Sequence, residues 1–437
     1  MMPILEWRTL TSAQRTQALR RPTQETRAEI VTATRDIIAE VRAGGDTALL
    51  ELTHHFDGAD LDGLAVSDQE FEAARAKLAS EARRALERAI DNVRRFHEAQ
   101  VPAPLSVETT PGVRCEQRVV PIRAVGLYVP AGSAPLPSTA VMLAVPAEIA
   151  RCPERVLCTP PQADGTANAA VLYVAQRCGI ERVFKIGGAQ AVAAMAYGTQ
   201  SVPKVDKIFG PGNAWVTTAK QLIAQDADGA ACDLPAGPSE VLVIADESAR
   251  ADFVAADLLA QAEHSPDAQV MLVTPSRRLA REVCQQIEQQ LVRLGRHQIV
   301  RQSLGGSRIV LVDDLAAALE VSNAYGPEHL ILEVEQPRRW LERVANAGSV
   351  FLGAWSPEPM GDYCTGTNHV LPTEGYARVL SGLSLVDFTK RISVQELSAD
   401  GLRDLGPVAR TLAQLEGLDA HANAVSIRLE ALGRADR

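Results

Sequence analysis

The sequence predicts an α/β protein built from two doubly wound parallel sheets. From Val119 onward, apolar runs of strand length alternate with alanine-rich helical stretches. This order favours parallel sheets covered by helices on both faces. The chain has 437 residues, which is too long for one ordinary core. Hydrophobic residues make up 46% of the chain, so there is enough apolar surface for two such cores.

The first hundred residues are predicted to be helical. One helix is expected over residues 23–43, with a stop at Gly44–Gly45, and a second, long helix over residues 68–100. The pair His54–His55 lies between them and is expected at the surface, because adjacent side chains cannot easily chelate one metal. His97 is expected only to complement the negative end of the long helix.

Strands are predicted in two groups, one for each sheet. The first group lies at residues 124–129, 155–159, 182–186 and 207–209. The second group lies at residues 240–245, 269–274, 307–312, 330–334 and 348–352. Helical stretches separate the strands within each group, as crossovers between parallel strands require. The last ~50 residues contain no strong strand pattern and are predicted to be helical.

Four parts are expected along the chain. Residues 1–22 form an N-terminal extension, and residues 23–122 together with 238–380 form one incomplete Rossmann-like domain. Residues 123–237 form the second such domain, and residues 381–437 form a small C-terminal helical domain.

Composition and charge exclude several classes of partner. The net charge of −10 argues against binding to nucleic acid or to an anionic membrane. No window approaches the ~20 apolar residues of a membrane span, and no targeting segment is evident. The seven cysteines are scattered and odd in number, which predicts reduced thiols in the cytoplasm rather than disulfides.

Three glycine-rich turns follow strands of the first group, after Val129, Ile186 and Phe209. Such turns let backbone amides and helix N-termini approach an anion such as a pyrophosphate. Each turn alone is more simply an ordinary tight turn, and the one at Gly210 lacks the third glycine of the dinucleotide fingerprint. Together they predict a ligand crevice at one sheet edge. The polar side chains expected at that edge are Tyr128, Gln190 and Asn213.

Glu328 and His329 are the candidate acid–base pair. A carboxylate beside an imidazole suits proton transfer, because histidine titrates near neutral pH and a neighbouring acid can orient it. A solvated strand end is the alternative. Adjacent residues on a regular strand point to opposite faces. Both can therefore serve one site only if the backbone is irregular, and Gly326–Pro327 is the expected cause.

Two segments carry candidate metal ligands. Gln261 and His264 share one face at the end of a helix. A polar helix end is the alternative, and glutamine is an unusual zinc ligand. A glycine-rich loop after the last strand carries Asp362 and His369, both able to ligate a metal, and for His369 the alternative is a hydrogen bond to the loop backbone. Cys364 in the same loop is a candidate nucleophile for an aldehyde, but no basic neighbour in the sequence would activate it.

The last helix adds His421, with Glu416 shortly before it. His421 lies in the first turn, where the helix dipole disfavours imidazolium and leaves a nitrogen lone pair free. A partly buried structural histidine is the alternative. An apolar stripe on this helix suits packing on a partner helix. It consists of Leu418, Ala422, Val425, Leu429 and Leu432.

Nine blocks of the sequence, in order along essentially the whole chain, resemble the motifs of the histidinol dehydrogenase family. The blocks are GLYVPAG, GGAQA, FGPGNAWV, DLPAGPSE, AQAEHS, AYGPEHL, GTNHVLPT, FTKRISVQELS and EGLDAHANAV. Any one block is a modest signal, whereas nine in the family's order are highly specific.

The resemblance implies a role for individual residues. Glu328 and His329 match the family's acid–base residues, with His329 as the main proton acceptor. The matches to zinc ligands, one ion per subunit, are Gln261, His264, Asp362 and His421. The matches to substrate contacts are Ser239, Gln261, His264, His329, Asp362, Glu416 and His421. The matches to NAD contacts are Tyr128, Gln190 and Asn213. Cys364 matches no functional residue of the family, which speaks against a thiol mechanism.

The resemblance also implies the reaction and the assembly. The reaction is the NAD-dependent four-electron oxidation of L-histidinol to L-histidine through bound L-histidinaldehyde, which completes histidine biosynthesis. The enzyme is expected to be a homodimer in which Glu416 and His421 serve the partner's site. A related zinc-dependent dehydrogenase of another small hydroxy substrate is the alternative.

Overall fold

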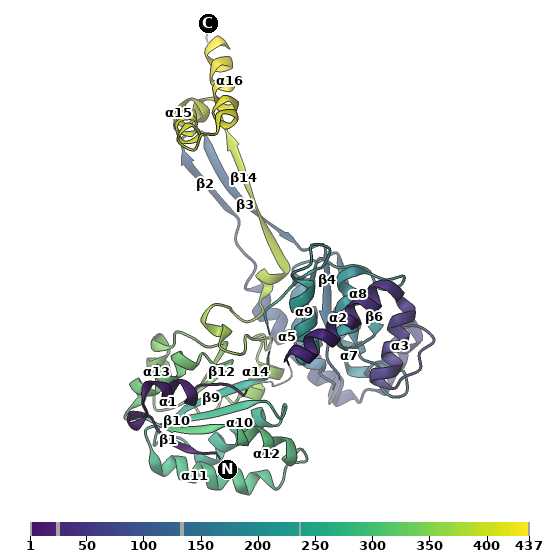
Figure 1. Cartoon of the computed structure of the whole chain (residues 1–437), viewed down its shortest axis with the longest axis vertical. Coiled ribbons are helices and arrows are strands. Elements are labelled where there is room, and N and C mark those ends of the chain that lie inside the picture. The colour runs from purple at the N-terminus through teal and green to yellow at the C-terminus, as the bar shows by residue number, and fades with distance from the viewer. Residues whose placement is uncertain (1, 23–26, 132–134, 236, 436–437) are drawn as a thin grey trace. The chain divides into compact units, whose positions relative to one another are not determined.

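The computed structural model describes residues 2–22, 27–131, 135–235 and 237–435 (Figure 1). It divides into two compact units. The first contains the residues up to Gln100 and Ile122–Phe388, and the second contains Val101–Pro121 and Thr389–Arg437. Two parallel sheets lie in the first unit, and the second holds one antiparallel sheet and two helices. The predicted α/β fold class is therefore confirmed.

The larger sheet of the first unit has six parallel strands in the order β1-β11-β10-β9-β12-β13. Its strands are β1 (Ile4–Glu6), β9 (Glu240–Ala245), β10 (Gln269–Thr274), β11 (Arg308–Leu311), β12 (His329–Glu333) and β13 (Ser349–Leu352). Central strands such as β9 and β10 are buried along their whole length, as a sheet covered on both faces requires, and they are apolar except for Glu240, Gln269 and Thr274 at their ends.

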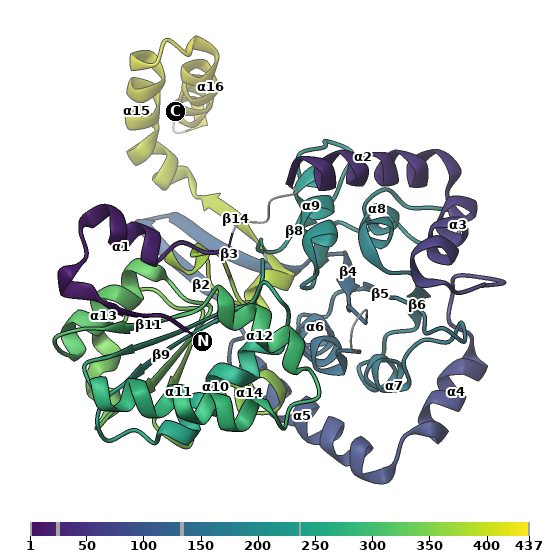
Figure 2. The same ribbon diagram turned by 60° about the horizontal axis from the view of Figure 1, so that its bottom comes forward.

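Helices cover both faces of this sheet (Figure 2). One face packs against α10 (Ala251–Ala262), α11 (Arg277–Leu291) and α12 (His297–Gly305). The other face packs against α13 (Leu315–Tyr325) and the N-terminal segment around Trp7 and Leu19. Shorter elements of this half are η1 (Trp7–Thr9), α1 (Ser12–Ala18), η2 (Pro337–Arg343), α14 (Glu358–Tyr363) and η3 (Tyr376–Arg378).

The second parallel sheet has five strands in the order β6-β5-β4-β7-β8. They are β4 (Ala124–Tyr128), β5 (Glu154–Thr159), β6 (Arg182–Lys185), β7 (Lys207–Phe209) and β8 (Ala231–Cys232). One face packs against α4 (Asp68–Lys77), α5 (Ser80–Glu98), α6 (Pro137–Ile149) and α7 (Ala169–Arg177). The other packs against α2 (Arg27–Gly44), α3 (Asp46–Asp57), α8 (Gly188–Tyr197) and α9 (Ala214–Ile223). The segment η4 (Leu385–Phe388) ends the first unit.

The second unit is an antiparallel ribbon with a helical pair. Its strands are β2 (Leu105–Thr110), β3 (Val113–Pro121) and β14 (Thr389–Leu397), and its helices are α15 (Ala399–Leu415) and α16 (Asp419–Ala435). The prediction that the last part of the chain contains no strand was wrong for β14. Eight of its nine side chains are exposed, so no buried apolar run marked it as a strand.

Nine strands were predicted, and all nine are present with ends within one residue of the predicted ones. The predicted single helix over residues 68–100 is instead α4 and α5, because Leu78 adopts an extended conformation (φ −80°, ψ 127°). Residues 23–26 at the start of the first predicted helix, and Gly132 in the first glycine-rich turn, lie outside the described residues.

His97 does not have the expected role at a helix end. It is fully buried in the last turn of α5, where its Nδ1 lies 2.8 Å from the carbonyl oxygen of Val93. Burial lowers its pKa, so the neutral ring is favoured and cannot complement the helix dipole. The pair His54–His55 lies in α3, and His54 forms an exposed ion pair with Asp60. No helix within the described ranges is long and apolar enough to span a membrane.

Candidate functional site

The Glu328–His329 pair lies at an irregular turn between α13 and β12. Gly326 follows the last helical residue with φ 64° and ψ 64°, a left-handed conformation that glycine adopts without strain. Glu328 then precedes the strand, and His329 is its first residue. Because Glu328 stands outside the strand, the two side chains are not forced to opposite faces. Glu328 Oε2 lies 3.5 Å from His329 Nδ1.

The main chain of Glu240, the first residue of β9, contacts both members of this pair. Its N–H donates to Glu328 Oε2 at 2.8 Å, and its carbonyl oxygen lies 3.1 Å from His329 Nδ1. A carbonyl can only accept, so Nδ1 carries a proton. His329 Nε2 is buried and has no hydrogen-bond partner among the described residues. Asp362 Oδ1 is 3.5 Å away from it. The free nitrogen is therefore the one that can accept a proton.

The electrostatic surroundings of His329 are strongly negative. Burial lowers the pKa of His329, but the charge of Glu328 and the interaction with Asp362 outweigh it, and the pKa lies well above the ordinary value. The pKa of Asp362 is lowered, because the interaction with His329 outweighs the effect of its own burial. Burial raises the pKa of Glu358, the third carboxyl in this region. The site therefore holds more carboxylates than positive charges to balance them.

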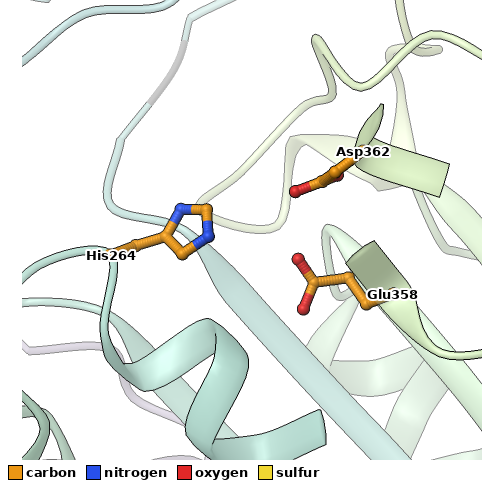
Figure 3. Close-up of side chains that lie close together, drawn as sticks. All are labelled: His264, Glu358 and Asp362. Atoms are coloured by element: carbon orange, nitrogen blue, oxygen red, sulfur yellow. The ribbon is translucent and has the colours of Figure 1, made fainter. Parts of the chain in front are cut away.

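His264, Glu358 and Asp362 form a cluster suited to a metal ion (Figure 3). One ligand atom from each lies within 4.8 Å of the others. His264 follows the C-terminal end of α10, and the two carboxylates lie four residues apart on α14, so they share a helix face. In Figure 3 the imidazole and both carboxylates point toward a common space.

Gln261 is fully buried beside this cluster. In the amide orientation that satisfies its neighbours, its nitrogen donates to both oxygens of Glu358, at 2.7 and 2.9 Å. Its oxygen then accepts from the N–H of Glu240 at 3.2 Å. Glu358 was missed from the sequence, although its spacing of four residues from Asp362 was a usable signal.

The donor set fits a divalent metal. One imidazole nitrogen and several carboxylate oxygens are ligands that zinc accepts. The raised pKa of Glu358 and the unpartnered Nε2 of His329 both indicate a place where a cation would be stabilising. The arrangement thus has room and charge for an ion beside a histidine base.

A large cavity of about 1160 Å³ is lined by residues of both parallel-sheet halves of the first unit. Residues of the five-stranded half that line it include Tyr128, Gln190 and Asn213. From the six-stranded half, His264, Tyr363 and Cys364 line it. The structure therefore brings the predicted nucleotide contacts and a predicted metal ligand to one space, which is large enough for a dinucleotide.

A buried ion pair holds the glycine turn after β7 at the wall of this cavity. Lys220 Nζ forms an ion pair with Asp233 and donates to the carbonyl oxygen of Gly210 at 2.9 Å. Asp233 Oδ2 accepts from the N–H of Gly210 at 2.7 Å. Gly210 has φ 126°, and a Cβ there would lie 2.1 Å from the carbonyl oxygen of Tyr128. Only glycine fits, and the turn is fixed from both sides.

Comparison with known proteins places the chain in a family. A family model for histidinol dehydrogenase matches residues 19–429. The chain is 55% identical to a histidinol dehydrogenase of Vibrio vulnificus over 432 residues, covering 99% of each chain. It is 56% identical to one of Xanthomonas campestris over 428 residues, covering 98% of this chain and 99% of that one. The crystal structure of histidinol dehydrogenase from Elizabethkingia anophelis superposes with a TM-score of 0.93, at 43% identity and 99% coverage of each chain.

This chain belongs to the histidinol dehydrogenase family. It is therefore an oxidoreductase of histidine biosynthesis, as its sequence motifs predicted. In this member of the histidinol dehydrogenase family, the two sheets present opposite ends to the site. Tyr128 ends β4, whereas Glu240 and His329 begin β9 and β12. The six-stranded sheet, which presents the amino ends of its strands, departs from the usual rule that ligands bind at the carboxyl ends of parallel strands.

The remaining predicted site residues lie at two places. Ser239 directly precedes β9, is partly exposed, and accepts from the N–H of Gln269 through its carbonyl at 3.1 Å. Glu416 and His421 belong to the second unit, Glu416 at the end of α15 and His421 in the first turn of α16. Both are exposed. His369 binds the carbonyl oxygen of Asp362 through Nδ1 at 2.8 Å, so it supports the loop that carries that carboxylate.

Proposed function

We propose that this chain oxidises L-histidinol to L-histidine with two molecules of NAD⁺, through bound L-histidinaldehyde. The observation that carries the proposal is the unpartnered Nε2 of His329. It lies beside Asp362, whose cluster partner His264 lines the dinucleotide-sized cavity. Hydride removal from an alcohol needs a base, a group of side chains that can hold a metal ion, and a cavity for the cofactor.

In the first half-reaction, Nε2 of the neutral His329 ring takes the hydroxyl proton of the substrate while the substrate carbon loses a hydride to the dinucleotide. A bound metal ion would offset the carboxylate charge that raises the pKa of His329 and would so favour the neutral ring. The proton on Nδ1 stays bound to the carbonyl of Glu240, which keeps the ring in the accepting tautomer. Glu328 lies behind the ring, 3.5 Å from Nδ1, where its charge stabilises the imidazolium that forms.

In the second half-reaction, water adds to the bound aldehyde, with His329 again as the base. The resulting hydrate loses a second hydride and a second proton and becomes the carboxylic acid, which ionises to the carboxylate and releases the third proton. In all, one alcohol, one water and two NAD⁺ give one carboxylate, two NADH and three protons. Tyr128, Gln190 and Asn213 are proposed to hold the dinucleotide, because all three line the cavity.

The proposed zinc ligands are Gln261, His264 and Asp362, together with His421 of the second unit. Bound there, the metal would orient the nitrogen atoms of the substrate and lower the pKa of its hydroxyl group. Glu358 contacts the amide of Gln261 and holds it at the cluster. Ser239 and Glu416 are proposed to contact the substrate.

We further propose a homodimer in which Glu416 and His421 complete the partner's site. Both side chains are exposed, and apolar side chains of the same unit are exposed near them. The predicted stripe on α16 packs partly within the unit, since Leu429 lies against Gly406 of α15. The large apolar residues exposed on the helical pair and its connecting turn are Val408, Leu412, Leu415, Leu418 and Ile427, at 53%, 55%, 80%, 40% and 52% exposure, and of these only Leu418 belongs to the predicted stripe. Such a surface supports association.

Two Rossmann-like domains are likewise proposed, supported by two parallel sheets with separate cores. The predicted grouping of residues 23–122 with 238–380 is not kept, because the helices α2–α5 pack in the cores of the five-stranded sheet and Val101–Pro121 belongs to the second unit. A cytoplasmic location is proposed because all seven cysteines are free thiols in the described chain.

The test is the yield of NADH from a limiting amount of L-histidinol, with zinc and excess NAD⁺. Two NADH per substrate are expected, together with L-histidine as the product. His329→Ala is expected to lose NADH formation while keeping its metal. His54→Ala, at an exposed site with its own ion pair, is the matched control. One NADH per substrate, or full activity of His329→Ala, would contradict the proposal.

A further inference from the structure

Asp57 is a carboxylate in the wall of the cavity that the proposed reaction does not use. It is the last residue of α3, and it lines the cavity with Tyr128 and Gly188 of the five-stranded half. The C-terminal end of a helix carries partial negative charge, so the helix itself destabilises a carboxylate there. The position is therefore unfavourable for an aspartate unless the cavity supplies a partner.

No such partner exists among the described residues of the chain. Asp57 Oδ2 is buried without a hydrogen bond. Burial alone raises the pKa of Asp57 to about 6, and no neighbouring cation offsets it. Arg296 also lines the cavity, but it comes from the six-stranded half and has no such effect on Asp57. At neutral pH the group is mostly ionised, and a buried carboxylate without donors is costly.

The neighbours of Asp57 indicate which part of a dinucleotide reaches it. Its charge acts on the hydroxyl of Tyr128, and that hydroxyl accepts from the N–H of Gly188 at 3.0 Å. Gly188 begins α8, and a helix N-terminus suits a pyrophosphate. Hydride transfer requires the nicotinamide beside His329 in the other half. The end of the cofactor beyond the pyrophosphate, near Asp57, is then the adenosine.

We propose that Asp57 determines the choice of dinucleotide, accepting hydrogen bonds from the 2′- and 3′-hydroxyls of the adenosine ribose and excluding a 2′-phosphate. This inference rests on the proposed use of NAD⁺. A diol supplies the two donors that the carboxylate lacks, whereas a phosphate brings a second negative charge to a desolvated acid. An acidic side chain at the ribose is a general device for this selection.

The experiment compares the affinities of NAD⁺ and NADP⁺ for the full-length parent and three variants. Dissociation constants are measured by quenching of tryptophan fluorescence, because Trp215 lines the cavity. Asp57→Asn and Asp57→Ser remove the charge. Asp60→Asn makes the same change three residues away, at a side chain that is 91% exposed and outside the cavity lining. Thermal melting checks folding, and removal of an unpaired buried charge is not expected to lower the melting temperature.

The parent is expected to prefer NAD⁺, and both Asp57 variants should shift the ratio of dissociation constants toward NADP⁺ by about tenfold or more. Asp60→Asn should leave the ratio unchanged. An unchanged ratio in folded Asp57 variants overturns the inference. The proposed reaction is judged separately, by NADH formation from L-histidinol in the parent, so it can fail while the ratio still reports on Asp57. A parent that binds neither dinucleotide overturns both.

Discussion

The carbonyl oxygen of Glu240 holds the imidazole of His329, with 3.1 Å between that oxygen and Nδ1. The same residue is bound from the other side by the N-terminal segment. Arg21 forms a buried, two-pronged ion pair with the Glu240 carboxylate, with 2.8 Å between Nη2 and Oε2. Arg21 also donates to the carbonyl oxygens of Tyr325 and Gly326, at 3.1 and 3.3 Å. One guanidinium therefore fixes the turn that precedes the acid–base pair and also Glu240, whose main chain contacts the pair.

Removing this guanidinium should impair turnover more than cofactor binding. Arg21→Met is expected to lower kcat about 10-fold to 100-fold, since small misplacement of reacting groups is costly, with the KM for NAD⁺ little changed. Arg21→Lys should recover part of kcat, because it keeps the charge without the fork. Steady-state kinetics measure both. Arg15→Met is the control, as the guanidinium of Arg15 contacts Trp7 within the N-terminal segment. Equal loss in both Met variants would assign Arg21 a purely structural role.

The Lys220–Asp233 pair should govern cofactor affinity through the Gly210 turn. Asp233→Asn is expected to destabilise the fold by about 3 kcal/mol, because breaking a buried pair leaves an uncompensated charge. The KM for NAD⁺ should rise about tenfold as the turn loosens. The double variant Lys220→Met/Asp233→Leu should be more stable than Asp233→Asn, since it leaves no buried charge.

Urea denaturation and steady-state kinetics on the same preparations separate the loss of fold stability from the rise in the KM for NAD⁺. If the double variant Lys220→Met/Asp233→Leu were less stable than Asp233→Asn, the free energy gained from the ion pair would exceed the cost of desolvating its two side chains.

Metal retention should depend on Asp362. Asp362→Asn removes the charge of one of the three groups in the cluster and is expected to weaken zinc binding by at least about tenfold. The measurement is metal content after gel filtration, together with the shift in melting temperature on zinc addition. Asp313→Asn is the control, because that side chain is 68% exposed and forms an ion pair with the equally exposed Arg8. Full zinc occupancy in Asp362→Asn would exclude this carboxylate as a ligand.

Stability should fall as the pH rises between about 4 and 7, on account of two buried carboxyls away from the site. Burial raises the pKa of Asp257 to about 7. Burial, reinforced by Asp257 and Asp252, raises that of Glu333 to about 7. In this window the folded chain binds more protons than the unfolded chain, so raising the pH favours unfolding.

Glu333→Gln removes one of these carboxyls and should change the pH dependence in a defined direction. It should be more stable than the parent at pH 8 by about 2 kcal/mol and show little difference at pH 4.5. Urea titrations at the two pH values measure the difference in the free energy of unfolding between the variant and the parent. Glu335→Gln, at an exposed position, should show no such difference. A variant less stable than the parent at pH 8 would contradict the expectation.

The parallel sheets could be predicted because their strands are buried on both faces and read as continuous apolar runs. The run from Glu240 to Ala245 is fully buried, and its predicted ends match the observed ones. The ribbon strands β2, β3 and β14 could not be predicted in this way. The side chains of β2 and β14 are mostly exposed and those of β3 are mostly half-buried, so neither an apolar run nor a buried alternation marks them.

The candidate site was predictable where chemistry follows from local pattern, as at Gly326–Pro327 before the Glu328–His329 pair. Contacts between distant segments leave no such pattern. Arg21 and Glu240 are 219 residues apart, and an isolated arginine reads as a surface residue. Glu358 was missed because a glutamate after a proline in a polar loop normally faces solvent. Only the packing of α14 against α10 places it at Gln261.

The exposed ribbon of the second unit has a consequence for how the chain unfolds. A three-stranded ribbon that buries so little apolar surface has little cohesive energy of its own. The stability of the ribbon would then come from a surface that covers it, and would depend on protein concentration if that surface belongs to a second copy of the chain. Dilution should fray the ribbon and its helical pair first, at a concentration that leaves both parallel sheets intact. With the proposed homodimer covering this surface, the chain is expected to melt in two stages, and only the earlier stage should shift with protein concentration.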